Sequence, residues 1–287
     1  MSEAAAPIAA PAPATPKPTP VPAQATAPVA APVVPGKKYR IGVIPFLNVQ
    51  PLLWGLKDGH TLVTVPPSRM GQALQEGRVD VAIAPVVAHF LNPELTVVPV
   101  AGIVSKGAVQ SVRLLHHRPL GRILRIWADS NSQNSVFLSR LILKRWYGVK
   151  KPDIVTADMS TFHANQIGPW DACLQIGDAA LNAAPFGMTV TDLGTEWTRQ
   201  TGKPFVYAVW TARNVEIARE VHPMLMAAKN EGLKHFDDIV KAYKGFWVFD
   251  QPKLKAYLEN NLAFDLGPAE MQGLMEFKNL LKEEGFL

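Results

Sequence analysis

Short apolar runs rich in β-branched residues alternate with helix-like segments from Tyr39 onward. Strands are predicted in "YRIGVIP", "LVTVP" and "DVAIAPV", and the last is apolar at nearly every position, as expected of a buried parallel strand. A helix is predicted in "SRMGQALQEG", with Ser68 as its N-cap and Gly77 at its end. Further strands are predicted in "ELTVVPVAGIV" and "GAVQSVRLLHH". This alternation is typical of α/β layers.

The pattern restarts after Pro119. A strand is predicted over Arg122–Asp129 and an amphipathic helix over Asn134–Gly148, and the alternation continues in "DIVTA", "DACLQIGDAALNAA" and "KPFVYAVW". The last quarter, from Val215, is mostly helical in pattern. We therefore expect two lobes, with residues 119–208 forming a second lobe inserted into a first lobe made of residues 38–118 and 209–287.

Residues 1–37 differ in composition from the rest of the chain. They are rich in Pro and Ala and contain ten of the 25 prolines. Such a segment predicts an extended, disordered tail without a packed core. It has no basic n-region and its apolar runs are broken by proline, so it does not predict a secretory signal, and we expect a cytoplasmic protein. No stretch approaches the roughly 20 apolar residues of a membrane span.

Charge and residue counts narrow the chemistry. The net charge of +5 belongs to the folded part and favours a small anionic ligand. Lys and Arg form no stripe with interleaved aromatic residues, which argues against nucleic acid as a partner. The chain has one cysteine, its seven histidines lack metal-ligand spacing, and there is no P-loop or G-x-S-x-G elbow. We expect no metal and no cofactor, and nothing in the pattern specifies an oligomeric state.

Polar residues stand at three predicted strand-to-helix junctions. Ligands bind at the carboxyl ends of strands in open α/β sheets, where helix N-termini supply free N–H groups. Asn48 follows the first strand, and a polar run that begins at Ser130 precedes the long helix. The candidates for substrate binding are Ser130, Asn134, Ser135, Gly177 and Asp178.

Each of these junction residues has a structural interpretation as well, because Ser, Asn and Asp are also the preferred N-caps. For Asp178 the structural role is favoured, since a carboxylate stabilised by a helix N-terminus is a poor base. For Asn48 and the serine-rich run ligand binding is favoured, because one helix needs only one cap. Ser111, within "VQSVRLL", can contribute a hydroxyl to the ligand site only if its side of the strand faces the cleft between the lobes. The sequence favours neither a ligand contact nor a purely structural role for this residue.

Six segments together resemble the chorismate dehydratases, which act in the futalosine route to menaquinone. They occur in order as "IGVIPFLNVQPL", "GRVDVAIAPV", "GAVQSVRLL", "DSNSQNSVFLSRLIL", "CLQIGDAAL" and "DLGTEWTRQTGKPFVYAVW". The likeness covers Tyr39–Trp210, and the C-terminal helices only in general character.

The resemblance implies a fold like that of the type II periplasmic binding proteins, with two α/β lobes, an interdomain cleft and a two-strand hinge. It implies a hydro-lyase that converts chorismate, a dianion, into 3-[(1-carboxyvinyl)oxy]benzoate. It implies catalytic roles for Asn48 and Ser111, and substrate contacts from Asn134 and Ser135. At position 134 this chain has Asn where Thr is usual in the family. The Asn side chain can still form hydrogen bonds, but it reaches further than that of Thr. We expect a substrate carboxylate to take the proton, with Asn48 orienting it and a serine assisting the leaving hydroxyl.

Two other functions remain open. One is an enzyme like 1,4-dihydroxy-6-naphthoate synthase, although the "PFLN" opening favours the dehydratase. The other is a non-catalytic protein that binds or senses a small anion, including a relative that binds chorismate without turnover.

Overall fold

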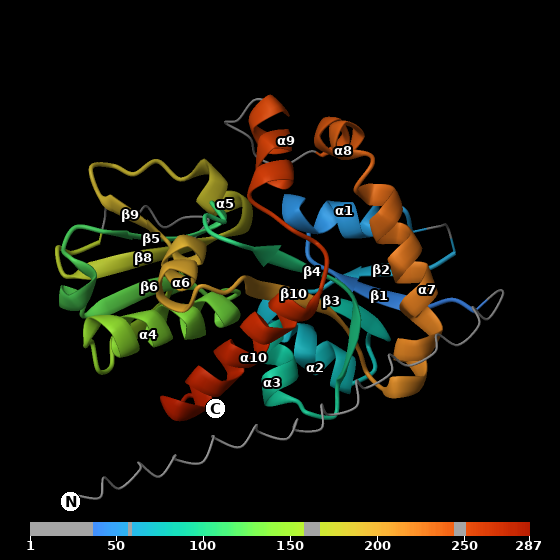
Figure 1. The fold of residues 1–287 in the computed structure, drawn as a ribbon, viewed down its shortest axis with the longest axis horizontal. Coiled ribbons are helices and arrows are strands. Elements are labelled where there is room, and N and C mark those ends of the chain that lie inside the picture. The colour runs from blue at the N-terminus through green and yellow to red at the C-terminus, as the bar shows by residue number, and fades with distance from the viewer. Residues whose placement is uncertain (1–36, 57–58, 158–166, 244–250) are drawn as a thin grey trace, which may run out of the picture.

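The chain forms two five-stranded mixed sheets that lie side by side and are flanked by helices (Figure 1). This computed structural model describes residues 37–56, 59–157, 167–243 and 251–287. Apart from Lys37, the predicted tail lies outside the described residues. None of the helices in the described ranges is long and apolar enough to cross a membrane.

The first sheet has the strand order β2-β1-β3-β10-β4. Its strands are β1 (Arg40–Val43), β2 (Thr61–Thr64), β3 (Val81–Pro85), β4 (Thr96–Ser105) and β10 (Phe205–Ala212). β1 pairs in parallel with β2 and β3, whereas β10 is antiparallel to both β3 and β4. The prediction for "DVAIAPV" is confirmed in that β3 is buried at every position, but only one of its two neighbours is parallel.

The second sheet has the order β7-β6-β8-β5-β9. Its strands are β5 (Val112–His116), β6 (Arg125–Asp129), β7 (Asp153–Ala157), β8 (Asp171–Ile176) and β9 (Thr189–Asp192). β6 pairs in parallel with β7 and β8, and β5 is antiparallel to β8. The sequence did not predict β9, because "TVTD" contains a single strongly apolar residue.

The chain passes between the sheets twice, after β4 and before β10. β5 belongs to the second sheet although its residues precede the expected limit at 118, and β10 begins at Phe205, before the expected limit at 209. The first difference has a simple origin, because β4 and β5 follow one another without a helix and their apolar patterns run together. We propose that the two lobes are divided at these two crossings.

Helices cover the sheets and fill the C-terminal quarter (Figure 1). The α-helices are α1 (Gln50–Leu53), α2 (Met70–Gln75), α3 (Val86–Leu91), α4 (Gln133–Tyr147), α5 (Gly177–Asn182), α6 (Leu193–Thr201), α7 (Val215–Gly232), α8 (Phe236–Ala242), α9 (Gln251–Asn260) and α10 (Pro268–Glu283). Short 3-10 turns are η1 (Leu47–Val49), η2 (Pro67–Arg69) and η3 (Leu120–Arg122).

The two helices predicted in most detail form with different accuracy. α4 matches its prediction and ends at Gly148, whose φ of +72° is the left-handed conformation that glycine adopts easily. The predicted helix at Ser68 instead begins as η2 and continues as α2. Ser68 lies inside η2, and no side chain caps either element, so its predicted N-cap role is wrong.

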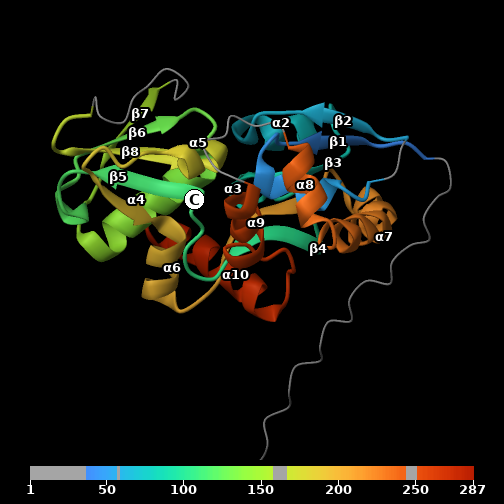
Figure 2. The ribbon, with the colours of Figure 1, turned by 90° about the horizontal axis from the view of Figure 1, so that it is seen from above.

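One hydrophobic core runs under both sheets. Trp197 of α6, Phe205 of β10 and Phe277 of α10 pack edge to face, with ring centroids 4.9 to 5.8 Å apart. Trp197 comes from the second lobe and the other two from the first-sheet side of the chain. Seen from above, α9 and α10 lie along the junction of the two sheets (Figure 2). The packing that holds each sheet is therefore shared across the junction.

α7 approaches α1 at backbone distance. A Cβ atom at Gly232 would lie 1.8 Å from the carbonyl oxygen of Pro51. Only a residue without a side chain fits here, and the close approach fixes α1 and the adjoining turn η1 against the first lobe.

Candidate active site

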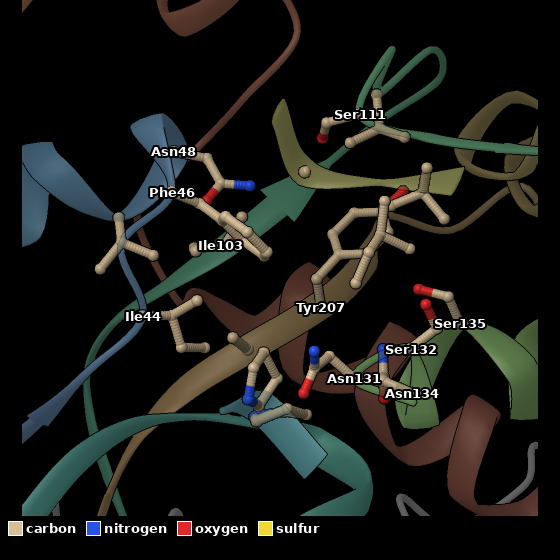
Figure 3. Close-up of a pocket in the computed structure, with 18 residues that line it drawn as sticks. Ile44, Phe46, Asn48, Ile103, Ser111, Asn131, Ser132, Asn134, Ser135 and Tyr207 are labelled. Carbon is tan, nitrogen blue, oxygen red and sulfur yellow. The ribbon is translucent and has the colours of Figure 1, made fainter. Parts of the chain in front are cut away.

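A pocket of about 570 Å³, its open mouth included, lies between the two sheets (Figure 3). Its walls are largely apolar, with Ile44, Phe46 and Ile103 on the side of the first sheet and Val112 and Ile176 on that of the second. The polar residues that line it are Asn48, Ser111, Asn131, Ser132, Asn134, Ser135 and Tyr207. Among the described residues of the lining, none carries a charged side chain. Such a pocket suits a small ring with polar substituents.

Asn48 enters the pocket from η1, as the sequence predicts for a ligand contact. The cap position of η1 is Phe46, and no side chain makes a capping hydrogen bond there. The Oδ1 atom of Asn48 is buried and has no hydrogen-bond partner among the described residues. A buried acceptor without a partner is uncommon in proteins, so this amide is available to a ligand.

Ser111 faces the pocket from the start of β5, which decides the question that the sequence left open. The preceding residue, Gln110, has a φ of +59°, an uncommon conformation for a residue other than glycine. The carboxylate of Asp192 stabilises this turn by accepting the backbone N–H groups of Val109 and Gln110 at 3.1 and 2.7 Å. Asp192 also caps α6 through the N–H of Thr195. The turn directs the buried Ser111 hydroxyl toward the cleft.

The N-terminus of α4 supplies the second polar wall. Asn134 and Ser135 lie in its first turn and are buried, and Ser132 occupies the cap position without a side-chain capping bond. Ser132 Oγ and Asn134 Oδ1 are buried and unpartnered among the described residues. The positive end of the helix dipole and the free hydroxyl of Ser132 suit an anionic group, whereas Asn134 Oδ1 can accept a hydrogen bond from a ligand hydroxyl.

Ser130 is not part of this wall. It is exposed and lies outside the pocket lining, whereas Asn131 and Ser132 are in it. β6 ends at Asp129, as predicted, and the turn that follows places Ser130 toward solvent. Of the polar run that begins at Ser130, the structure therefore brings Asn131, Ser132, Asn134 and Ser135 to the pocket and leaves Ser130 outside it.

Gly177 lines the pocket, but its N–H is not free. It donates to the carbonyl oxygen of Ser111 at 2.8 Å. The φ of Gly177 is +56°, and a Cβ there would lie 2.9 Å from the ring of Phe46. The role of Gly177 in this site is to let Phe46 approach β8 and α5, rather than to donate to a ligand.

Asp178 lies next to the pocket and is not in its lining. Its Oδ1 accepts the N–H of Leu47 at 3.2 Å, and its Oδ2 accepts the hydroxyl of Tyr243 at 2.7 Å. Both partners belong to the first lobe, so this second-lobe carboxylate holds η1, the turn that carries Asn48. The structural role that the sequence favoured for Asp178 agrees with these contacts, and its predicted contact with substrate has no support in them.

The buried carboxyl of Asp178 predicts a pH-dependent stability. Burial raises its pKa above the ordinary value, against the effect of the hydrogen bonds from Tyr243 and Leu47. Between the ordinary and the raised pKa the folded protein binds more protons than the unfolded chain, so this group lowers the stability as the pH rises. In Asp178→Asn the amide oxygen still accepts from Leu47, and the hydroxyl of Tyr243 can donate to Pro45 O at 2.8 Å.

We expect the free energy of unfolding of the wild type to fall relative to Asp178→Asn between about pH 4 and pH 7. Urea unfolding of both proteins at the two pH values measures this difference. Taking the difference removes the contributions of carboxyls such as Asp80, whose lowered pKa acts in the opposite direction. A gap between the two proteins that is the same at both pH values would contradict the prediction.

Comparisons with known proteins agree with this architecture. A family model described as "Menaquinone biosynthesis" matches residues 39–283. A chorismate dehydratase from Thermus thermophilus is 26% identical over 265 residues, which cover 85% of this chain and 96% of that protein.

Solved structures show the fold. A protein from Archaeoglobus fulgidus superimposes with a TM-score of 0.71 at 14% identity, covering 87% of this chain and 98% of its own. The alkanesulfonate-binding protein of Xanthomonas axonopodis pv. citri, bound to MOPS, gives a TM-score of 0.62 at 15% identity, covering 87% and 94%. The fold is thus that of the periplasmic binding proteins, as the resemblance implied, with α/β layers in both lobes.

Proposed function

The chain belongs to the menaquinone biosynthesis family, and on this premise we propose that it is a chorismate dehydratase. The reaction removes water from chorismate and gives 3-[(1-carboxyvinyl)oxy]benzoate. The observation that carries the proposal is the uncharged pocket between the sheets, in which three buried polar atoms, Asn48 Oδ1, Ser132 Oγ and Asn134 Oδ1, lack partners among the described residues. As part of the same proposal, the enzyme acts in the cytoplasm, where its biosynthetic substrate is made.

The two carboxylates of chorismate suit the polar walls. We assign one of them to the first turn of α4, where Ser132, Asn134 and Ser135 gather at the positive end of a 15-residue helix. Neutral donors hold an anion without the desolvation of a buried countercharge. Asn134, which stands where Thr is usual, still presents an amide to this wall. We assign the ring of the substrate to the apolar part of the wall, where Ile44, Ile103 and Val112 line the pocket.

The elimination breaks two bonds on neighbouring ring carbons. The carbon that bears the enolpyruvyl ether loses a proton, its neighbour loses hydroxide, and the electron pair of the C–H bond completes the aromatic ring. Formation of the aromatic ring supplies the driving force, so the protein has mainly to orient the substrate and stabilise charge as it develops.

We propose that a carboxylate of the substrate itself takes the proton. The nearest protein carboxylate that the sequence suggested, Asp178, has its oxygens engaged by Leu47 and Tyr243. Asn48 is placed to orient the substrate carboxylate, and Ser111 to donate to the departing hydroxyl. Both side chains reach the pocket from opposite lobes (Figure 3), so the reacting face of the substrate lies between them.

Incubation of the purified protein with chorismate tests the function. Mass spectrometry should show the loss of one water, and ultraviolet absorbance the appearance of an aromatic product. Unchanged chorismate together with binding in calorimetry would instead favour the non-catalytic anion-binding function. The absence of both turnover and binding would overturn the proposed function.

Removing the hydroxyl of Ser111 should slow the reaction. In Ser111→Ala we expect kcat to fall by about 100-fold, the lower end of what a positioned proton donor to a leaving group contributes. The variant also deprives the buried hydroxyl of Tyr257 of its acceptor at 2.8 Å, which costs about 1–3 kcal/mol of stability.

Steady-state kinetics and thermal unfolding measure the two effects of Ser111→Ala separately. Thr201→Val is a suitable control, because it removes a hydroxyl that donates to Trp197 O at 2.9 Å at the end of α6, outside the pocket lining. A kcat for Ser111→Ala equal to that of this control would remove Ser111 from the mechanism.

A further inference from the structure

Tyr257 lies directly behind the two residues to which we assign the chemistry. It belongs to α9, which lies between α5 and α1 above the junction of the sheets (Figure 1). Its side chain is 3% exposed, and its hydroxyl donates to Ser111 Oγ at 2.8 Å, across 146 residues of sequence. The side chain of Asn48 lies near the same hydroxyl and acts to lower the pKa of the phenol, against the effect of burial. One phenol thus connects a residue of the first lobe with a residue of the second.

The directions of these bonds determine what each neighbour offers to a ligand. Because Tyr257 donates to Ser111, the Oγ atom of Ser111 acts as the acceptor in this bond. The hydrogen of the Ser111 hydroxyl is therefore free to be donated to a ligand. The Oδ1 of Asn48 has no partner, and the lowering effect of Asn48 on the pKa of the phenol is the one expected when an amide N–H faces the phenol oxygen. Burial raises the pKa of Tyr257, so the phenol keeps its proton at neutral pH and remains a donor.

We propose that Tyr257 is a positioning residue of the active site, whose hydroxyl holds Ser111 as a donor and the Asn48 amide in one orientation toward the substrate. Tyr257 is absent from the pocket lining, so it acts through these two neighbours and does not touch the ring of the substrate. The inference rests on the proposed dehydration for its kinetic consequence. The orientation of the Ser111 and Asn48 side chains that it predicts does not depend on which reaction is catalysed.

Tyr257→Phe removes the hydroxyl and keeps the ring that packs in the core. With chorismate as substrate we expect kcat to fall about tenfold and KM to change by less than about twofold, since loss of orientation acts mainly on the transition state. A purely structural role would instead lower the melting temperature and leave kcat of the folded enzyme unchanged. Tyr147→Phe is the matched control, because its hydroxyl donates to Glu196 at 2.8 Å, away from the pocket. It should keep the kcat of the wild type.

Crystal structures of the wild type and Tyr257→Phe complete the test. We expect Ser111 and Asn48 each to take up new or multiple rotamers in the variant. An unchanged kcat in Tyr257→Phe, or side chains of Ser111 and Asn48 that stay in place, would overturn the inference. If the wild type does not convert chorismate, the proposed function fails, and the comparison of rotamers still decides whether Tyr257 positions these residues.

Discussion

Replacing Asn48 with alanine is expected to lower kcat for chorismate dehydration by about 10²- to 10³-fold, the usual effect of removing a preorganised polar group from a reacting centre. Asn48 reaches the pocket from η1, and its Oδ1 is buried without a partner among the described residues. The turn that carries it is held by Asp178 through the N–H of Leu47. The amide is thus already oriented before the substrate binds, and alanine offers nothing in its place.

Steady-state kinetics on folded protein measures this effect. Asn92→Ala is the matched control, because its amide donates to Ala88 O at 2.6 Å in a part of the fold remote from the pocket lining. Asn48→Asp adds a second test, since a carboxylate of the same shape should repel the dianion and raise KM as well as lower kcat. A kcat for Asn48→Ala within about threefold of the wild type would contradict the role assigned to this residue.

Gly232→Ala is expected to destabilise the protein by about 3 kcal/mol, at the upper end of the usual cost of overpacking. The added methyl would lie 1.8 Å from the carbonyl oxygen of Pro51, which is backbone and cannot rotate away. The better helix propensity of alanine returns only about 1 kcal/mol. For a chain of this size we expect the melting temperature to fall by about 6–12 °C. Because Pro51 belongs to α1, a shift of that helix would also displace Asn48 and lower kcat below the melting range.

Thermal unfolding followed by circular dichroism gives the melting temperature. Gly168→Ala is the control, since its new methyl would meet nothing closer than 3.5 Å. Equal melting temperatures for Gly232→Ala and the wild type would show that α7 and α1 are further apart than described here.

The pattern of apolar residues predicted most of the strands and helices, because most of them bury an apolar run; β2 and β7 are largely exposed and were recognised by their β-branched residues. It failed where that signal was weak. β9 is a short edge strand with polar side chains, and it pairs because β5 offers it a partner. The passage between the sheets after β4 leaves no mark in the pattern, since β5 in the second sheet is as apolar as β4 in the first.

The candidate site was predictable to the level of the junction and not always to the residue. Asn48, Ser111, Asn134, Ser135 and Gly177 line one pocket, and four segments far apart in sequence bring them there. Whether Ser130 or Ser132 faces inward depends on the length of a single turn. Tyr257 could not be identified, because a tyrosine on the buried face of an amphipathic helix has the pattern of an ordinary core residue. Its hydroxyl acquires a role only from the partners that the fold supplies.

The aromatic contact of Trp197 with Phe205 and Phe277 has a consequence for cooperativity. These rings belong to a single cluster of buried residues that extends beneath both sheets. Melting of one lobe therefore exposes part of the packing of the other, and we expect the lobes to unfold together, although the second lobe also has a small separate cluster of Leu115, Ile167, Cys173 and Met188. The candidate pocket takes its walls from both lobes, so we expect it to be lost in the same transition.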